Sequence, residues 1–223
     1  MNFNIKLCCT VFLVFLMFSC DFEQTTGSYN ETFGVAFEAD DGSLFIRSDN
    51  GEIIVPDESL TTILDGGDRV WISYTIKSSD EQTKTLHVRP YRVLSVAIAN
   101  LSRESTATTD DGVDLREVWI AQNFLTFDFH VRAKDQNAIK NHQYILIQKS
   151  IINDTLNIKF IHDAQANTGT LSCRTAVALN LDDLPAQSKI LTLAIEYKDL
   201  LDGTLKMVYR NLLIKDKNIY NDN

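Results

Sequence analysis

The second half of this 223-residue chain contains one cysteine and three histidines, the residue types that could form a nucleophile–base pair. A cysteine becomes a strong nucleophile when a neighbouring base removes its proton. Cys173 lies in the alternating segment LSCRTAVALNL with the parity of Thr175 and Val177, which predicts an inward-facing side chain. A buried free cysteine behaves as a small hydrophobic residue. We therefore expect no catalytic pair between Cys173 and the candidate bases, which are His130, His142 and His162.

Carboxylates gather in ADDGSLFIRSDNGE and in TTDDGVD, where a calcium loop could form. Neither segment has the Asp-x-Asp-x-Asp-Gly order and closing Glu of such a loop. Asp41-Gly42 and Asn50-Gly51 are typical of tight turns, which need no metal. No two histidines have the spacing of zinc ligands. The sequence therefore predicts neither a metal site nor another cofactor.

Four residues could form an aromatic and basic binding face, because they share the parity that points away from the predicted core: Trp71, His87, Arg89 and Tyr91. Such platforms stack single-stranded nucleic acid when they lie beside a cationic groove. This chain has 21 Lys and Arg against 30 Asp and Glu, a net charge of −9, so we expect no nucleic-acid partner. The face could contact a peptide, a glycan or another protein, or it could be cross-strand aromatic pairing with a local charge patch.

The N-terminus carries an apolar segment that follows Lys6 and ends at Cys20. Residues 7–18 would span about 18 Å as a helix, which is too short for a hydrocarbon core of about 30 Å. A basic start, an apolar middle and a small residue before a cut site are typical of secretory signals. The Ser19–Cys20 junction resembles the bacterial lipoprotein signal, which implies cleavage before Cys20 and lipidation of that cysteine. A plain secretory signal or a buried helix are the alternatives.

Removal of residues 1–19 has two consequences for the mature chain. Cys173 becomes its only free thiol, so we expect no internal disulfide, and hydrophobic cores must provide stability. The acyl chains on Cys20 would hold the protein stably to a membrane.

The rest of the sequence predicts an all-β chain with two domains. Residues 20–32 are polar and read as a lipidated tether. Residues 33–100 contain five alternating segments with Gly-marked bends, which favours a small OB-like Greek-key barrel over an open sandwich. The segment DESLTTILDGGD could add a helical turn or a loop before the fourth strand. Pro90 suggests an edge or a bulge in the fifth.

Residues 101–114, rich in Ser, Thr and Asp, predict a linker between the domains. Six alternating segments follow in residues 115–216, and their regular spacing indicates an antiparallel β-sandwich. Residues 217–223 form a polar tail. The predicted inward positions include Leu125, Phe127, Phe129 and Val131, whereas Thr126 and Asp128 lie on the outward parity.

This layout resembles the NigD-like lipoproteins of Bacteroidetes, on the strength of the lipoprotein signal, DDGSLFIRSDNGEIIVP and REVWIAQNFLTFDFHV. The resemblance implies an N-terminal OB domain, a C-terminal β-sandwich and a lipidated cysteine at Cys20. It implies no established activity. The family is named for its association with bacteriocin gene clusters, from which an immunity role has been supposed.

Two short motifs fit the same lineage. Asp154–Leu156 resembles the O-glycosylation motif of Bacteroidetes, with Thr155 as acceptor. An ordinary turn that runs into a strand also explains these residues and is the interpretation we favour. Asp21 and Glu23 follow Cys20 as in signals that send lipoproteins to the cell surface. The periplasmic and the outer face of the outer membrane both stay open.

We therefore expect a non-enzymatic, monomeric envelope lipoprotein that serves as a binding, assembly or protective module for a protein, peptide or glycan. One alternative is a fimbria-assembly or adhesin lipoprotein, which would exchange a β-strand ahead of Phe33 between subunits. Another is a hydrolase that works through His or Asp residues.

Overall fold

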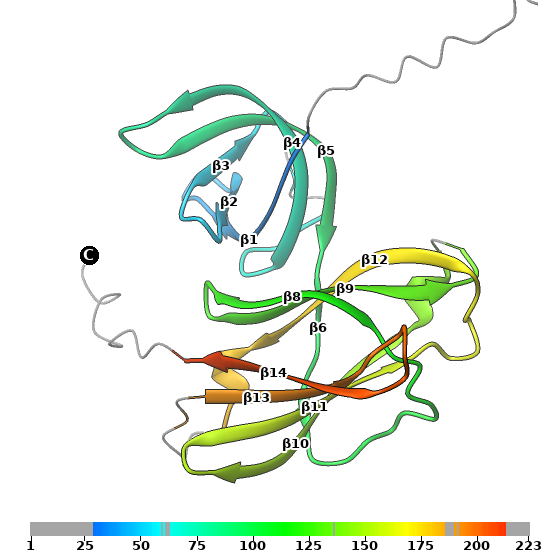
Figure 1. Ribbon diagram of the computed structural model, residues 1–223. Coiled ribbons are helices and arrows are strands. Elements are labelled where there is room, and N and C mark those ends of the chain that lie inside the picture. Colours follow the sequence, from blue (N-terminus) through cyan, green and yellow to red (C-terminus); the bar gives the residue numbers. More distant parts are fainter. Residues whose placement is uncertain are drawn as a thin grey trace, which may run out of the picture.

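The computed structural model describes residues 29–58, 60, 63–135, 137–185, 190 and 192–212. Five strands close into a barrel in which the neighbours run in the order β1-β2-β3-β5-β4 (Figure 1). These strands are β1 (Asn30–Glu38), β2 (Leu44–Ser48), β3 (Ile53–Pro56), β4 (Arg69–Asp80) and β5 (Thr85–Ser95). The predicted OB-like barrel is confirmed.

The barrel is filled by one parity of each strand, as the alternation predicted. Val70, Ile72 and Tyr74 of β4 pack in this core with Ile46 and Ile54. Between β3 and β4, in the segment expected to form a helical turn or a loop, the amide of Leu64 donates to the carbonyl of Leu60 at 3.0 Å. Both leucines are buried in the barrel core.

The bulge suggested by Pro90 is present and changes the parity of β5. Ser73 lies opposite Arg92 and Tyr74 lies opposite Pro90, so Tyr91 is an extra residue. Beyond this bulge Val93 packs against the barrel core, whereas Leu94, which has the sequence parity of the core residue Val88, packs in a different cluster.

The second domain is a sandwich of two sheets with the strand orders β14-β13-β11-β10-β7 and β6-β12-β9-β8. Two 3₁₀ turns, Ala138–Asn141 and Leu181–Asp183, connect strands. β11 pairs with β13 in parallel, and the short strands β6 and β7 pair in parallel with β12 and β10. The sandwich was predicted to be antiparallel throughout, and these three parallel pairs correct that prediction. The strands are β6 (Ala97–Ile98), β7 (Leu101–Ser102), β8 (Asp114–Ala121), β9 (Phe124–Ala133), β10 (Gln143–Ile152), β11 (Thr155–Asp163), β12 (Leu171–Asn180), β13 (Thr192–Lys198) and β14 (Leu205–Asn211).

The core between these sheets contains the residues that the sequence placed inward. Leu125, Phe127, Phe129 and Val131 are fully buried there. Phe160 of the facing sheet stacks on Phe127, with ring centroids 5.0 Å apart. A continuous apolar core of this kind needs no disulfide for its stability.

Two predicted boundaries were wrong. Strand β1 begins at Asn30 and pairs with β4, so residues 30–32 belong to the barrel and not to the tether. Strands β6 and β7 already pair with the sandwich, so the change of domain lies just after β5 rather than within residues 101–114. Strands of two residues are too short to give an alternating pattern.

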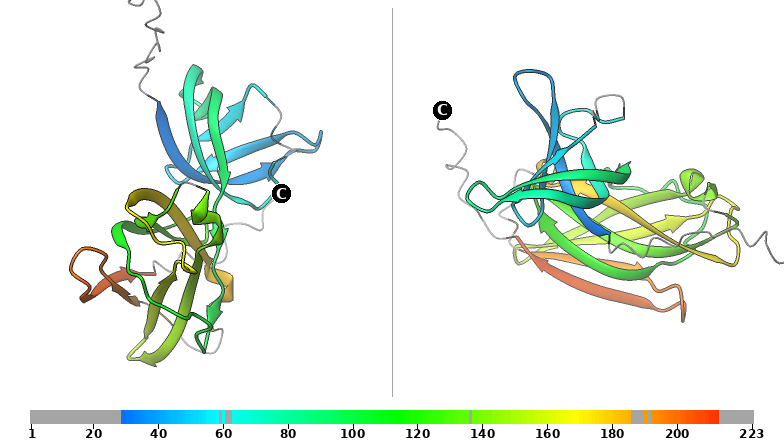
Figure 2. Two further views of the ribbon diagram at one scale, coloured as in Figure 1. Left: turned by 90° about the vertical axis from the view of Figure 1, so that its right-hand side faces the viewer. Right: turned by 90° about the horizontal axis from the view of Figure 1, so that it is seen from above.

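The molecule has three layers: the barrel, the four-stranded sheet and the five-stranded sheet (Figures 1 and 2). The barrel packs on the outer face of the four-stranded sheet, and the five-stranded sheet lies on the far side. The described residues contain no helix that is long and apolar enough to cross a membrane.

Candidate functional site

The barrel and the sandwich share an apolar interface. Phe33 stacks on Trp71 within the barrel, with ring centroids 5.3 Å apart, and meets Trp119 of β8 edge-on at 5.0 Å. Phe124 and Ala178 of the sandwich pack in the same cluster. Because both domains bury side chains here, the two are held as one unit.

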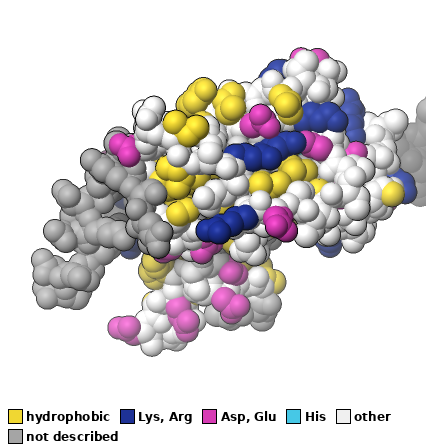
Figure 3. Space-filling model, turned by 90° about the horizontal axis from the view of Figure 1, so that it is seen from below, with side chains coloured by type: hydrophobic (Ala, Val, Ile, Leu, Met, Phe, Trp, Pro, Cys, Tyr) yellow, Lys and Arg dark blue, Asp and Glu magenta, His cyan; other side chains and the backbone are white. Residues whose placement is uncertain are grey.

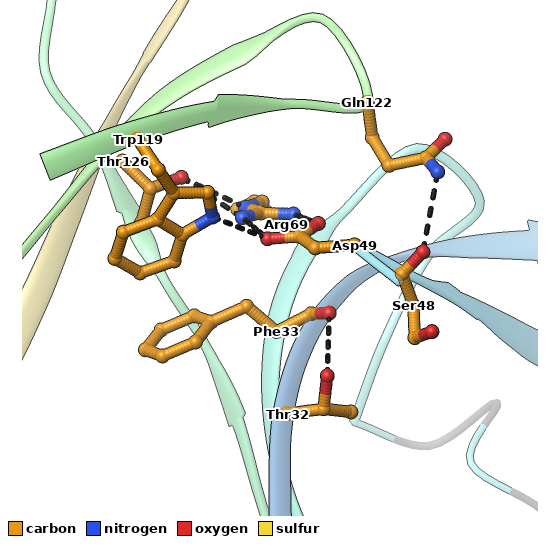
Figure 4. Close-up of polar contacts among 8 residues, drawn as sticks. All are labelled: Thr32, Phe33, Ser48, Asp49, Arg69, Trp119, Gln122 and Thr126. Carbon is orange, nitrogen blue, oxygen red and sulfur yellow. Dashed lines mark hydrogen bonds and ion pairs between the residues drawn. The ribbon is translucent and has the colours of Figure 1, made fainter. Parts of the chain in front are cut away.

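A buried arginine reinforces this interface (Figure 4). Arg69, at the start of β4, donates from Nη1 and Nη2 to the two carboxylate oxygens of Asp49 at 2.6 and 2.5 Å. It also donates from Nε and Nη2 to Oγ1 of Thr126 on β9, at 3.2 and 2.9 Å. Trp119 donates from Nε1 to Asp49 at 2.6 Å. A planar guanidinium suits such a two-sided contact because its donors have a fixed geometry.

A second arginine connects the domains from the sandwich side. Arg174 of β12 donates from Nε and Nη2 to the two carboxylate oxygens of Asp128 on β9, at 2.9 and 2.8 Å. Its Nη1 donates to Glu31 of the barrel at 2.8 Å. The guanidinium lies 4.5 Å from the ring centroid of Trp71. The hydrogen bonds that Arg174 donates to Asp128 raise the pKa of its guanidinium, so this cation is permanent.

A cleft of about 380 Å³ opens between these two arginine clusters. Phe33 and Trp119 form its aromatic part, and Arg174 lies at its wall. Four carboxylates also line it: Glu31, Asp49, Glu117 and Asp128. Against them stand the guanidiniums of Arg174 and of Arg69 behind Asp49, which leaves two negative charges in excess. An acidic cleft with aromatic walls suits a cationic group that has an apolar stem.

The predicted face of Trp71, His87, Arg89 and Tyr91 is divided in the structure. Trp71 is 6% exposed because the sandwich covers it. His87 and Arg89 are exposed on β5, and Tyr91 contacts Tyr29 with ring centroids 4.3 Å apart. Covering by the second domain is a non-local effect that strand parity does not reveal.

Cys173 is not placed as a nucleophile. It is 2% exposed in the sandwich core, and burial raises the pKa of its thiol. Among the described residues, no hydrogen bond joins Cys173 to a histidine. His130 instead lies 3.7 Å from a carboxylate oxygen of Asp114.

The other two histidines of the sandwich form a buried pair. Nε2 of His162 lies 2.9 Å from Nδ1 of His142, and Nδ1 of His162 lies 2.9 Å from the carbonyl oxygen of Gly112. Burial lowers the pKa of both imidazoles, which keeps them neutral. The pair therefore ties the segment before β8 to β11. In the described part of the chain, no group of three or more His, Cys, Asp and Glu side chains could hold a metal ion.

Of the two predicted modification sites, Cys20 and Thr155, the structure describes only Thr155. Cys20, Asp21 and Glu23 lie outside the described residues. Asn153 and Asp154 form the two-residue turn between β10 and β11, with φ of 48° and 60°, and Thr155 is the first residue of β11. This geometry is that of an ordinary hairpin turn, and glycosylation of Thr155 stays a prediction.

Sequence reasoning missed the polar residues of the interface. Thr126 and Asp128 carry the outward parity, yet they are 0% and 5% exposed because the barrel covers them. Arg69 opens a strongly apolar strand, and that position was the one available signal for a buried arginine.

Three solved structures with this architecture come from Bacteroides species. A NigD-like immunity protein from Bacteroides caccae is 20% identical, with a TM-score of 0.63, and the match covers 81% of this chain and 92% of that one. A protein of unknown function from Bacteroides vulgatus is 13% identical, with a TM-score of 0.61, 88% of this chain and 96% of that one. A candidate lipoprotein from Bacteroides fragilis is 14% identical, with a TM-score of 0.58, 84% of this chain and 100% of that one. At these identities the likeness shows the fold.

No functionally curated protein gives a significant match to the chain. A family model does match: residues 96–209 fit the NigD-like C-terminal beta sandwich domain. The match begins directly after β5, where the structure places the change of domain. Since it covers more than half of the 223 residues, the chain belongs to the NigD-like family that this β-sandwich domain defines.

Proposed function

We propose that this protein is a non-enzymatic lipoprotein of the cell envelope, held to the outer membrane through a lipid on Cys20. It acts there as a monomeric binding or protective module. Its interdomain cleft receives a cationic group of a partner, such as an arginine or lysine side chain of a protein or peptide.

The observation that carries this proposal is the charge of the cleft. Glu117 forms no ion pair with any described residue, and Glu31 shares Arg174 with Asp128. The excess carboxylate charge would attract a cation, and the aromatic walls would pack against its stem. Because the cleft is built from both domains, the partner would be recognised by the joined unit.

Similar proteins support a protective role at the cell envelope. One neighbour is named a NigD-like immunity protein and another a candidate lipoprotein, and a protective role at the envelope is consistent with both names. The strand-exchange alternative gains no support, because the residues ahead of Phe33 pair with β4 inside the closed barrel.

The test uses the intrinsic fluorescence of the full lipidated chain in detergent. Its two tryptophans, Trp71 and Trp119, both lie at the domain interface. We expect hexa-arginine to change their emission saturably and hexa-glutamate not to do so. High salt should weaken the effect, because exposed charges are screened.

Glu117→Gln should weaken the binding of hexa-arginine severalfold. Glu81→Gln, an equal charge change at the exposed turn after β4, is the matched control and should leave it unchanged. An emission that does not respond to hexa-arginine, or equal losses in the two variants, would contradict binding in the cleft.

A further inference from the structure

The outer face of the five-stranded sheet carries a second hollow, on the side of the sandwich away from the barrel. Figure 3 looks onto this side of the molecule, where apolar side chains gather among basic and acidic side chains. The hollow measures about 400 Å³, which lies in the range of small-ligand sites. Eight residues line it, among them Ser150, Ile152, Asn157, Ala194, Glu196 and Met207.

The strand register explains why a hollow forms here. Ala194 of β13 lies opposite Tyr209 on one side and Asn157 on the other, and Asn157 lies opposite Ser150. These four residues form one row across four strands, and they face outward because the alternating positions fill the core. Because the side chain of Ala194 is short, the surface of the sheet is depressed at the centre of this row.

The next row has a similar chemistry. Asn211, Thr192, Thr155 and Ile152 lie opposite one another in turn. Neither row contains a charged side chain, although 23% of the residues in this chain are charged. Two adjacent rows therefore present hydroxyl and amide groups together with apolar side chains.

The polar groups of these rows are oriented by contacts with each other. Asn157 donates from Nδ2 to Oγ of Ser150 at 3.2 Å. Thr192 donates from Oγ1 to Oδ1 of Asn211 at 3.3 Å. Each of these groups retains further donor or acceptor capacity, because an amide has four hydrogen-bonding sites and a hydroxyl three. A ligand that lies on the rows could therefore both donate and accept.

Apolar side chains flank the polar groups. Met207 is 45% exposed, Tyr209 is 61% exposed and Ile152 is 59% exposed. The lining also contains Glu196 and the bulge residue Lys149, whose opposite charges cancel. The hollow thus offers apolar contact together with amide and hydroxyl groups, and its one acidic and one basic lining residue leave no net charge.

These properties select among ligand classes. A hydrocarbon chain would cover the amides and hydroxyls without satisfying them, which is unfavourable. A nucleic acid or another polyanion would need a basic track. A carbohydrate has hydroxyl groups that both donate and accept, and C–H faces that pack on apolar and aromatic side chains.

We propose that this hollow binds a neutral carbohydrate chain. The site is separate from the interdomain cleft, because the whole sandwich lies between them. A single molecule could then hold a cationic partner at one site and a glycan at the other.

Affinity electrophoresis of the full lipidated chain in detergent tests this directly. Native gels would contain dextran, mannan, xylan or mixed-linkage β-glucan, with dextran sulfate as the anionic comparison. We expect at least one of the four neutral polysaccharides to retard the protein. Met207→Ser and Tyr209→Ser should each weaken that retardation at least fivefold, and both sites are exposed enough for the fold to tolerate the change.

Leu205→Ser is the matched control, because Leu205 lies on the same strand and parity and is 59% exposed. It belongs to neither row, since it lies opposite Lys198, and it does not line the hollow. It should leave the retardation unchanged, as should the cleft variant Glu117→Gln. The proposal is overturned if none of the four neutral gels retards the protein, if dextran sulfate alone does so, or if Leu205→Ser weakens the effect as much as the other two.

Discussion

Arg69 of the barrel donates two hydrogen bonds to a single hydroxyl oxygen, Oγ1 of Thr126, on the sandwich. Both side chains are withdrawn from solvent, with exposures of 1% and 0%. This contact couples two domains that are 57 residues apart in sequence at this point. The contact fixes the orientation of the two domains, and this orientation determines the shape of the interdomain cleft.

Replacement of Thr126 by valine should destabilise the protein by about 2 kcal/mol, because it removes the acceptor of a buried charged donor. Thr126→Ser keeps the hydroxyl and is the matched control, with a smaller loss from its missing methyl group. Urea unfolding curves of the two variants measure the difference. Equal stability of Thr126→Val and Thr126→Ser would show that the hydroxyl contributes nothing.

Arg69→Met should cost more, about 3 kcal/mol, because the carboxylate of Asp49 then loses the cation that neutralises it. Arg89→Met provides the comparison, since Arg89 is exposed and lies 3.8 Å from its partner Asp57. That variant should change the free energy of unfolding by no more than about 0.5 kcal/mol. If the two substitutions have equal effects, Arg69 does not stabilise the interface as described.

The buried histidine pair predicts how stability depends on pH. Burial lowers the pKa of His142 and His162 in the folded state, so near pH 6 the unfolded chain binds more protons than the folded one. Their contribution is therefore present above the unfolded pKa of about 6.5 and is lost as the pH falls below that value. The free energy of unfolding, measured between pH 7.5 and 5, should decrease steadily towards acid.

The carboxylate beside the pair does not reverse this trend. Burial acts to raise the pKa of Asp163, but hydrogen bonds from Gln165, Thr108 and Thr109 outweigh it and lower that pKa well below its usual range. Its contribution is lost only at more acid pH. His142→Gln should flatten the slope between pH 7.5 and 5, whereas His87→Gln, at an exposed site, should not. An unchanged slope in His142→Gln would refute the assignment.

Strands β1 and β2 of the barrel approach each other closely at Gly34. A Cβ atom on Gly34 would lie 2.5 Å from the carbonyl oxygen of Arg47 and 2.6 Å from a side-chain carbon of Ile46. We expect Gly34→Ala to cost about 1–3 kcal/mol, because β1 and β2 must separate. At Gly66 the same atom would make ordinary contacts of 3.6 Å or more, so Gly66→Ala is the control and should be tolerated. Thermal melts that show equal midpoints for the two variants would contradict this.

The sequence allowed the two cores to be predicted because each strand is half-buried. Phe127 and Phe129 alternate with Thr126 and Asp128, and the first pair fills the sandwich core as expected. The same pattern predicted that Thr126 and Asp128 would face solvent, whereas both are buried under the barrel. Alternation records which face is polar, but it does not record that another domain will cover that face.

The candidate cleft could not be predicted for the same reason. Glu31 and Arg174 meet across 143 positions of sequence, and their contact depends on how the barrel is placed on the sandwich. The extra residue Tyr91 also shifts the parity of β5, so Leu94 packs in the interface cluster although it has the sequence parity of the barrel residue Val88. A single bulge reverses every later position of a strand.

We propose above that a lipid on Cys20 holds this protein to the cell envelope. The most direct measurement is metabolic labelling with a palmitate analogue in cells that express the full chain, followed by fractionation of membranes. The wild-type chain should take up the label and sediment with the outer membrane, and Cys20→Ala should do neither. Uptake of label by Cys20→Ala would contradict the claim.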